Sequence, residues 1–268
     1  MRIYAVLIYI FLYGPIALIV GFSFNAGKYA MAWQGFSLQW YAKAFSNPLI
    51  LRALQTSLTI ALSTAFLSCI IGTITALGLE RVKGKMRNVF DALLYIAIMV
   101  PGIVIGISTL IAFVTLFNFI NPLFISLWGF KVEMGVWTVI AAHVLFNLAV
   151  VCMLVRARLT GMDRSMVEAS EDLYASPWGT FRQVILPLLT PSILAGFLLS
   201  FTFSFEDFII TFFVSGPNVT LPIYVFSSIR RGVTPEINAV GTVVLLTSLV
   251  LLVVAQIILQ RSSRTTRS

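Results

Sequence analysis

The sequence predicts an all-α integral membrane protein with six transmembrane helices. Of its 268 residues, 59% are hydrophobic and only 10% are charged, and the mean hydropathy is +0.98. A water-soluble domain of this length could not bury that much apolar surface in one core. The apolar residues form runs of about 20, which cross ~30 Å of hydrocarbon as helices, whereas a β-barrel would show shorter alternating segments.

The first expected span, about residues 3–24, contains Gly14-Pro15. Proline frees backbone hydrogen-bonding groups, so this helix should kink. Its apolar part is too long for a secretory signal and no small-residue cleavage site follows it, so we expect the span to be retained. A second proline, in Pro101-Gly102, should break the third span. The other five spans are expected at about residues 53–79, 89–117, 135–155, 191–214 and 237–259.

Basic residues predict the orientation of the chain in the bilayer. Of the 18 Lys and Arg residues, twelve fall on one expected side of the membrane and six on the other. Because basic residues accumulate in short cytoplasmic loops, both termini are expected in the cytoplasm. Residues 1–260 should form a single transmembrane domain. Residues 261–268, a Ser/Thr-rich stretch with three Arg residues, should form a disordered basic tail.

The sequence argues against several classes of function. The net charge of +8 does not indicate nucleic-acid binding, because the basic residues lie between apolar runs rather than on one soluble face. Cys69 and Cys152 each fall inside an apolar run, which is typical of small packing residues. No nucleotide-binding motif, metal-spaced His/Cys cluster or nucleophile arrangement is present, so we expect no metal site and no catalysis by this chain.

His143, the only histidine, precedes Asn147 by four residues, so both lie on one face of the fourth span. Polar side chains within a membrane helix normally face protein or a wet cavity. We interpret the two residues as a polar pair that hydrogen-bonds a neighbouring helix, and the alternative is a role in a substrate pathway.

A charged segment between the fourth and fifth spans must lie outside the hydrocarbon. Ser165, followed three residues later by Glu168, has the pattern of a capping box, and apolar residues then recur at helical spacing. Ser176-Pro177 has the pattern of a second helix start, with Ser as the N-cap and Pro at the first helical position. The sequence therefore predicts two short helices that meet at a bend and can contact another protein.

This segment resembles the cytoplasmic EAA loop of ABC importer permeases, which reads Glu-Ala-Ala, three residues, Gly, and then a spacer to Ile-any-Leu-Pro. The matching residues are Glu168-Ala169-Ser170 and, downstream, Ile185-Leu186-Pro187. Tyr174 stands where the family has Gly. A left-handed backbone is costly for Tyr, so we expect the first helix to end elsewhere or the bend to use another geometry.

The resemblance extends over essentially the whole chain. Pro-Gly-Ile in the third span and Ser-Phe-Glu-Asp in the fifth are similar to the polyamine and opine branch of these permeases. The resemblance implies the type I ABC importer permease fold in the bacterial plasma (inner) membrane. It also implies a coupling loop, about residues 158–186, that inserts into an ATPase subunit. The residues expected to couple to the ATPase are Glu168, Ala169, Ser170, Leu173 and Tyr174.

The same resemblance implies the partners of the chain. They are an ATPase dimer, a second permease subunit, an external solute-binding protein and the lipid bilayer, and nucleic acid is not among them. ATP and Mg would bind the ATPase, so no cofactor is expected in this chain.

One acidic pair, Glu206-Asp207, lies within the expected fifth span. A carboxylate is costly in hydrocarbon and normally faces a bundle interior or a wet cavity. At 100° per residue Asp207 shares a polar stripe with hydroxyl residues, whereas Glu206 points away from it. We expect Asp207 to line a substrate pathway and Glu206 to pair helices or act as a second ligand; alternatively, both acids are structural. The stripe comprises Ser200, Ser204, Asp207 and Thr211.

Carboxylates in the pathway favour a cationic substrate by Coulomb attraction. We therefore expect a polyamine such as spermidine or putrescine, and an opine, another amine or a phosphonate remains an alternative. A secondary transporter driven by an ion gradient would explain the acids but not the pair of cytoplasmic helices, and no inverted repeat supports it. A membrane enzyme is disfavoured because no catalytic cluster is present.

Overall fold

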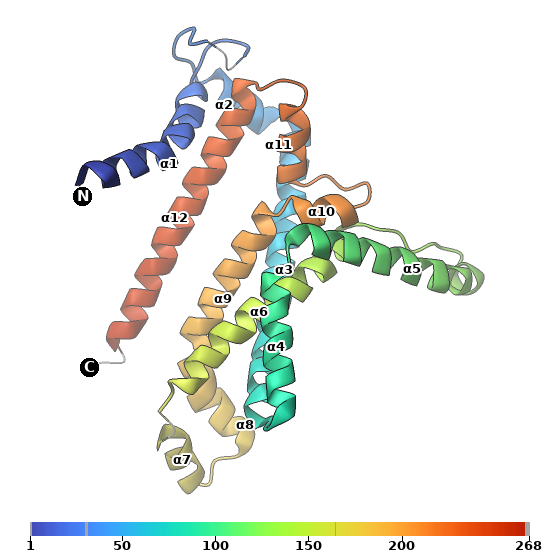
Figure 1. The fold of residues 1–268 in the computed structure, drawn as a ribbon, viewed down its shortest axis with the longest axis vertical. Coiled ribbons are helices and arrows are strands. Elements are labelled where there is room, and N and C mark those ends of the chain that lie inside the picture. The colour runs from blue at the N-terminus through green and yellow to red at the C-terminus, as the bar shows by residue number, and fades with distance from the viewer. Residues whose placement is uncertain (1, 30–31, 164, 266–268) are drawn as a thin grey trace. The chain divides into compact units, whose positions relative to one another are not determined.

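The computed structural model describes residues 2–29, 32–163 and 165–265. The described part of the chain is almost entirely helical, and its one isolated β-bridge joins Asn25 to Phe36 (Figure 1). The all-α prediction is therefore confirmed. The chain divides into two compact units where the sequence predicts one domain: residues 1–55 with 219–268, and residues 56–218.

The first unit is built around α12 (Pro235–Thr265), which contacts α1 (Arg2–Phe22), α2 (Gln39–Ser46) and α11 (Leu221–Ile229). Glu236, at the start of α12, accepts a hydrogen bond of 2.9 Å from Asn47 Nδ2 and pairs with Lys43 Nζ at 3.8 Å. The predicted tail falls partly on α12, which continues through Thr265, and residues 266–268 lie outside the described residues.

The second unit is built around α6 (Val136–Thr160). Its neighbours include α4 (Lys85–Met99), α5 (Gly102–Trp128), α9 (Leu186–Glu206) and α10 (Ile209–Val214). The part of α3 (Pro48–Arg81) from residue 56 onward also belongs to this unit. A buried apolar cluster joins α3, α4, α6 and α9, and a second one joins α3, α6 and α10.

Two glycines let α3 and α9 pack closely on α6. A Cβ added at Gly72 of α3 would lie 2.8 Å from the Cβ of Val151, and one added at Gly196 of α9 would lie 3.2 Å from Cγ2 of the same valine. Small residues at such contacts allow helix backbones in a membrane to approach each other. The fully buried Val151 thereby fixes the spacing of the three helices.

Two of the expected spans are interrupted. The third is split into α4 and α5 at Val100 and Pro101, which confirms the break expected at Pro101-Gly102. The fifth was expected to continue to residue 214, but α9 ends at Glu206, and Asp207 has an extended backbone before α10 begins. Both breaks lie in the second unit and position the site described below.

Four segments among the described residues are long and apolar enough to span a membrane: α3, α5, α6 and residues 177–206. Two shorter apolar helical segments, Val6–Phe22 and Pro235–Val250, lie where the first and sixth spans are expected. The number of six spans and the cytoplasmic position of both termini stay predictions.

Candidate functional site

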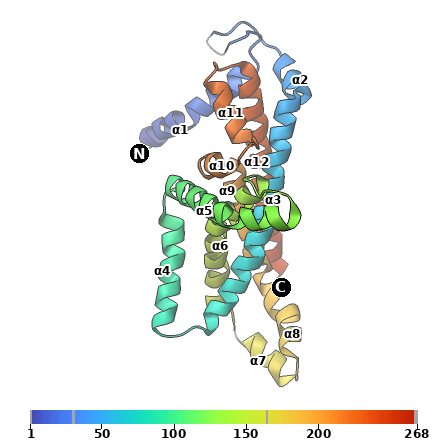
Figure 2. The same cartoon turned by 90° about the vertical axis from the view of Figure 1, so that its right-hand side faces the viewer.

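The predicted coupling segment forms two short helices, α7 (Ser165–Asp172) and α8 (Pro177–Thr180), beyond the ends of α6 and α9 (Figure 2). The start of α7 differs from the predicted capping box. Ser165 is the first helical residue rather than the N-cap, and its backbone N–H donates to Asp163 Oδ1 at 2.9 Å. This backbone hydrogen bond lowers the pKa of the Asp163 carboxyl below its usual range, because an ionised carboxylate is the better acceptor.

The end of α7 corrects the expectation for Tyr174. This residue has φ of 57° and is the only described non-glycine residue with a positive φ. The N–H of Tyr174 donates to Glu171 O at 2.9 Å and the N–H of Ala175 donates to Ser170 O at 3.1 Å. This hydrogen-bond pair is the Schellman motif, in which the left-handed position is usually Gly. The helix end is therefore not relocated: Tyr174 takes the glycine conformation itself.

The start of α8 is as predicted. Ser176 is the N-cap, its Oγ accepts the N–H of Gly179 at 3.1 Å, and Pro177 is the first helical residue. The hydroxyls of Ser170 in α7 and Thr180 in α8 are 3.0 Å apart and hydrogen-bond. The bend is therefore fixed both by its backbone and by a contact between the two helices.

A π-helical turn, η1 (Phe181–Ile185), joins α8 to α9. Pro187, in the first turn of α9, has no N–H to donate, and in an α-helix its ring would clash with the carbonyl four residues earlier. A wider turn just before the proline relieves that clash. The coupling helices therefore continue into the membrane helix, so a displacement of α8 can be passed to α9.

The predicted coupling residues do not all face the same way. Ser170 is partly buried against α8, whereas Glu168 and Ala169 are exposed. Leu173 and Tyr174 are 82% and 96% exposed. Exposed Met166 and Trp178 belong to the same two helices. We call the set Met166, Leu173, Tyr174 and Trp178 the coupling face.

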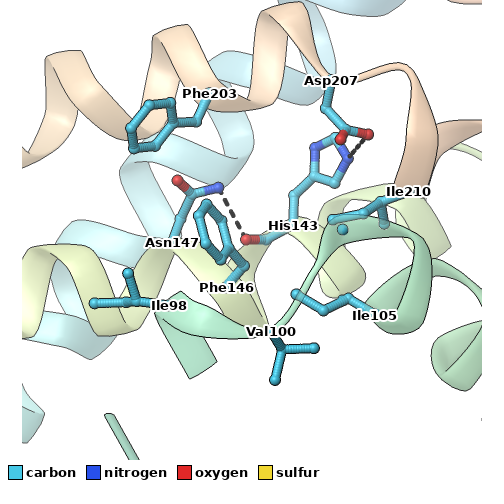
Figure 3. A pocket seen from close by; sticks show the side chains of 10 residues that line it. Ile98, Val100, Ile105, His143, Phe146, Asn147, Phe203, Asp207 and Ile210 are labelled. Carbon is cyan, nitrogen blue, oxygen red and sulfur yellow. Dashed lines mark hydrogen bonds and ion pairs between the residues drawn. The ribbon is translucent and has the colours of Figure 1, made fainter. Parts of the chain in front are cut away.

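The second candidate site lies where α9 ends, against α6. The carboxylate Oδ2 of Asp207 accepts the backbone N–H of Thr211 at 2.9 Å and the hydroxyl of Thr211 at 3.1 Å. The same oxygen is 3.2 Å from Nε2 of His143 (Figure 3). Nδ1 of His143 is 2.7 Å from the hydroxyl of Ser204. Because an ionised carboxylate only accepts, the hydrogen bond to Asp207 requires a proton on Nε2 of His143.

The hydrogen bonds explain why the helix breaks here. With its backbone extended, Asp207 uses its carboxylate to satisfy an N–H in the first turn of α10, as a capping side chain does. His143 of α6 is only 2% exposed, and the side chain of Asp207 is 19% exposed. The break is therefore held by three elements: α6, the end of α9 and α10.

The expected polar stripe is brought together only in part. Ser204, Asp207 and Thr211 converge on His143. Ser200 is fully buried, but among the described residues its hydroxyl has no hydrogen-bond partner. Glu206 is exposed and is not among the residues that contact His143.

His143, for which the sequence offered a pathway role only as the alternative, belongs to this cluster. Its partners Ser204, Asp207 and Thr211 lie outside its own helix, which confirms a polar contact with neighbouring elements. Asn147 instead donates from Nδ2 to the carbonyl of His143 in α6, at 2.9 Å. The sequence signals for this contact were a single His in one apolar span and a single acidic pair in another. Residue spacing could not show that these two spans pack against each other.

A cavity of about 230 Å³ lies between the two helix breaks. Val100 and Gly102 border it at the break between α4 and α5, and Asp207 borders it at the end of α9. His143 and Asn147 form part of its wall, as Figure 3 shows. Irregular backbone at membrane depth is tolerated where it lines a cavity inside the protein. The arrangement thus presents a carboxylate to a small, partly open cavity.

The chain is similar to known transport proteins. The model of the family "Binding-protein-dependent transport system inner membrane component" matches residues 68–268. The spermidine/putrescine transport system permease protein PotC of Haemophilus influenzae is 37% identical over 96% of this chain and 95% of its own length. The putrescine transport system permease protein PotI of Escherichia coli K12 is 40% identical over 88% of this chain and 82% of its own length.

Solved structures of the same architecture support the fold. A chain of a bacterial ABC transporter that imports alginate superposes with a TM-score of 0.69, covering 100% of this chain and 93% of its own, at 15% identity. A chain of the MetNI methionine ABC transporter gives a TM-score of 0.61 over 80% of this chain and 96% of its own, at 16% identity. With the family match over most of the sequence, this chain belongs to the binding-protein-dependent transport system inner membrane components, as a multi-pass permease of the bacterial inner membrane.

Proposed function

We propose that this permease imports a polyamine, spermidine or putrescine, or a related organic cation, as a subunit of an ATP-driven importer. The observation that carries the proposal is the carboxylate of Asp207 at a cavity between two broken helices. A negative charge in a low-dielectric site attracts a cation and repels an anion. The names of the relatives, a spermidine/putrescine permease and a putrescine permease, support the same class of substrate.

The coupling face, together with the exposed Glu168 and Ala169 of α7, is the proposed contact with the ATPase. Large apolar side chains that are this exposed usually mark an interaction surface, and Leu173 and Tyr174 stand on a bend that continues into α9. ATP and Mg bind the ATPase dimer in this proposal, and the chain itself carries no cofactor. A second permease subunit completes the pathway, and the external solute-binding protein delivers the substrate.

Uptake by the reconstituted importer tests the proposed substrate. The chain, its ATPase, the second permease and the binding protein are placed in proteoliposomes with radiolabelled putrescine, spermidine, an opine and a phosphonate as separate substrates. We expect ATP-dependent uptake of the two polyamines. Uptake of the phosphonate alone would contradict the proposal, because that substrate is anionic and the charge of Asp207 would oppose it. Uptake of the opine alone would also contradict the polyamine assignment.

A further inference from the structure

The cavity beside Asp207 contains a second polar atom that the hydrogen-bond network does not use. Asn147 is 1% exposed and lines the cavity, and its Oδ1 has no hydrogen-bond partner among the described residues. Its Nδ2 donates to the carbonyl of His143 at 2.9 Å. That bond fixes the orientation of the amide, because the flipped amide would place two oxygens against each other. Oδ1 is therefore a buried acceptor without a donor, a rare and costly arrangement in a folded protein.

The carboxylate of Asp207 can also accept further hydrogen bonds. All the hydrogen bonds from His143 and Thr211 to the carboxylate of Asp207 end on Oδ2. Among these described contacts, Oδ1 of Asp207 accepts none. The cavity wall therefore carries oxygen acceptors from two elements, α6 and the break after α9. A ligand group that donates several hydrogen bonds and accepts none would suit them.

Two aromatic rings complete the wall. Phe146 and Phe203 both line the cavity, with ring centroids 5.9 Å apart and planes tilted by 52° (Figure 3). The face of an aromatic ring attracts a cation, most strongly where water is excluded. Apart from His143, Asn147 and Asp207, the lining residues are apolar or Gly. These rings therefore add a preference for positive charge to the two acceptors.

We propose that this cavity is a subsite for a primary ammonium group of the substrate, in which Asn147 Oδ1 accepts a hydrogen bond, the carboxylate of Asp207 attracts the positive charge, and Phe146 and Phe203 line the wall. The inference rests on the proposed function and adds Asn147 and the two rings as determinants of specificity. About 230 Å³ is below the ~300–1,000 Å³ typical of sites for drug-sized ligands. The subsite thus fits one amine end of a slender chain better than a sugar or a peptide.

The test is putrescine binding by the detergent-purified complex of this chain, the second permease and the ATPase, without the binding protein. Asn147→Leu keeps a similar volume and removes the acceptor, so it should weaken binding roughly ten- to hundredfold, the loss of one hydrogen bond to a charged group. Thr64→Val is the matched control. Thr64 is also fully buried with an unpartnered hydroxyl among the described residues, but it does not line the cavity, so its variant should bind normally.

A second pair of variants keeps the test decisive if Asn147→Leu fails to assemble. Phe203→Leu removes a half-exposed ring and should weaken binding roughly three- to thirtyfold. Phe201→Leu, on the same helix, is its control, because Phe201 stacks on Phe205 and does not line the cavity. As a probe of chemistry, 1,4-butanediol keeps the length of putrescine without ammonium groups, and it should not compete.

The outcomes separate the subsite from the proposed function. Unchanged putrescine affinity in Asn147→Leu, or in Phe203→Leu where the first variant does not assemble, overturns the subsite. Competition by 1,4-butanediol, or no putrescine binding by the wild-type complex, also overturns it. The proposed function fails separately, in the assay with the binding protein present, if the wild-type importer takes up no amine.

Discussion

Tyr174 combines a backbone conformation that is unfavourable for a non-glycine residue with a side chain that is almost fully exposed. A non-glycine residue in the left-handed region is less stable by roughly 1–2 kcal/mol, and the Schellman hydrogen bonds at the end of α7 hold Tyr174 there. The ring makes up no part of the buried core, because the residue is almost fully exposed. We infer that the benefit of the ring lies in contact with a partner.

Tyr174→Gly tests that inference. Glycine relieves the backbone cost, so the free energy of unfolding of the variant permease should be higher than that of the wild type by about 1 kcal/mol. Uptake and substrate-stimulated ATP hydrolysis should nevertheless fall, because the ring is lost from the coupling face. Tyr174→Ala, which loses the ring and keeps most of the backbone cost, is the companion variant. Wild-type uptake by the glycine variant would show that the ring is dispensable.

Glu168→Lys reverses a charge on the exposed side of α7. The substitution also places a positive charge near the helix N-terminus, where negative charge is favoured by about 0.3–1 kcal/mol. We expect an inserted, folded permease that no longer stimulates ATP hydrolysis when substrate is delivered. Membrane extraction and ATPase assays on the purified complex measure the two properties. Normal stimulation would exclude Glu168 from the contact with the ATPase.

The two neighbouring acids should differ in importance. Asp207→Asn keeps the size of the side chain and an oxygen that can accept from Thr211, but it removes the charge at the cavity. Uptake should be lost while the complex still assembles. Glu206→Gln should have the milder effect, because Glu206 is exposed and stands outside the cluster. Equal or reversed effects on the uptake rate would refute this ranking.

At the scale of elements, the breaks were not equally predictable. Pro101-Gly102 marks the end of α4 because proline and glycine are direct signals of interrupted helices. The break at Asp207 has no such signal, and an apolar run that continues to residue 214 favours one helix. It depends on a tertiary contact with His143, sixty-four positions away, which periodicity cannot assign. Ser204, Asp207 and Thr211 meet at His143 across this break and not along one continuous helix, so their role in a substrate pathway stays a prediction.

Of the two coupling helices, α8 begins where the sequence predicted and α7 does not. Ser176-Pro177 identified the start of α8 because both residue types have a positional preference there. The start of α7 was misplaced because Asp163, two residues earlier, is an equally good cap and accepts the N–H of Ser165. The conformation of Tyr174 was wrongly expected because the backbone hydrogen bonds of the Schellman motif, one of them from the N–H of Tyr174, offset its strain whatever the side chain.

Ser176→Ala tests whether the order of α8 matters for coupling. Removing the hydroxyl that accepts the N–H of Gly179 should destabilise the helix by about 1 kcal/mol. Hydrogen exchange of residues 176–180 should become faster, and uptake should fall without loss of assembly. Ser176→Asp is a suitable control, because aspartate keeps a side-chain oxygen that can cap the helix. Equal exchange rates in both variants would argue against the cap.

At the scale of the whole molecule, composition was enough to predict a helical membrane protein. Helices that could span a membrane occur among the described residues in both halves of the sequence, as the apolar runs indicated. Composition did not predict the division into two compact units, because that division brings residues 1–55 together with residues 219–268. Pairing between distant segments depends on packing, such as that of Asn47 and Lys43 with Glu236, and leaves no local pattern in the sequence.

The central claim is that this chain forms an ATP-driven route for a cationic amine. The most direct measurement compares putrescine uptake into proteoliposomes containing the complete importer under two conditions. The first has ATP on the side of the ATPase and no ion gradient. The second has an imposed ion gradient and no ATP. The claim predicts uptake in the first condition only, and its loss in Asp207→Asn. Uptake driven by the gradient without ATP would contradict it and indicate a secondary transporter.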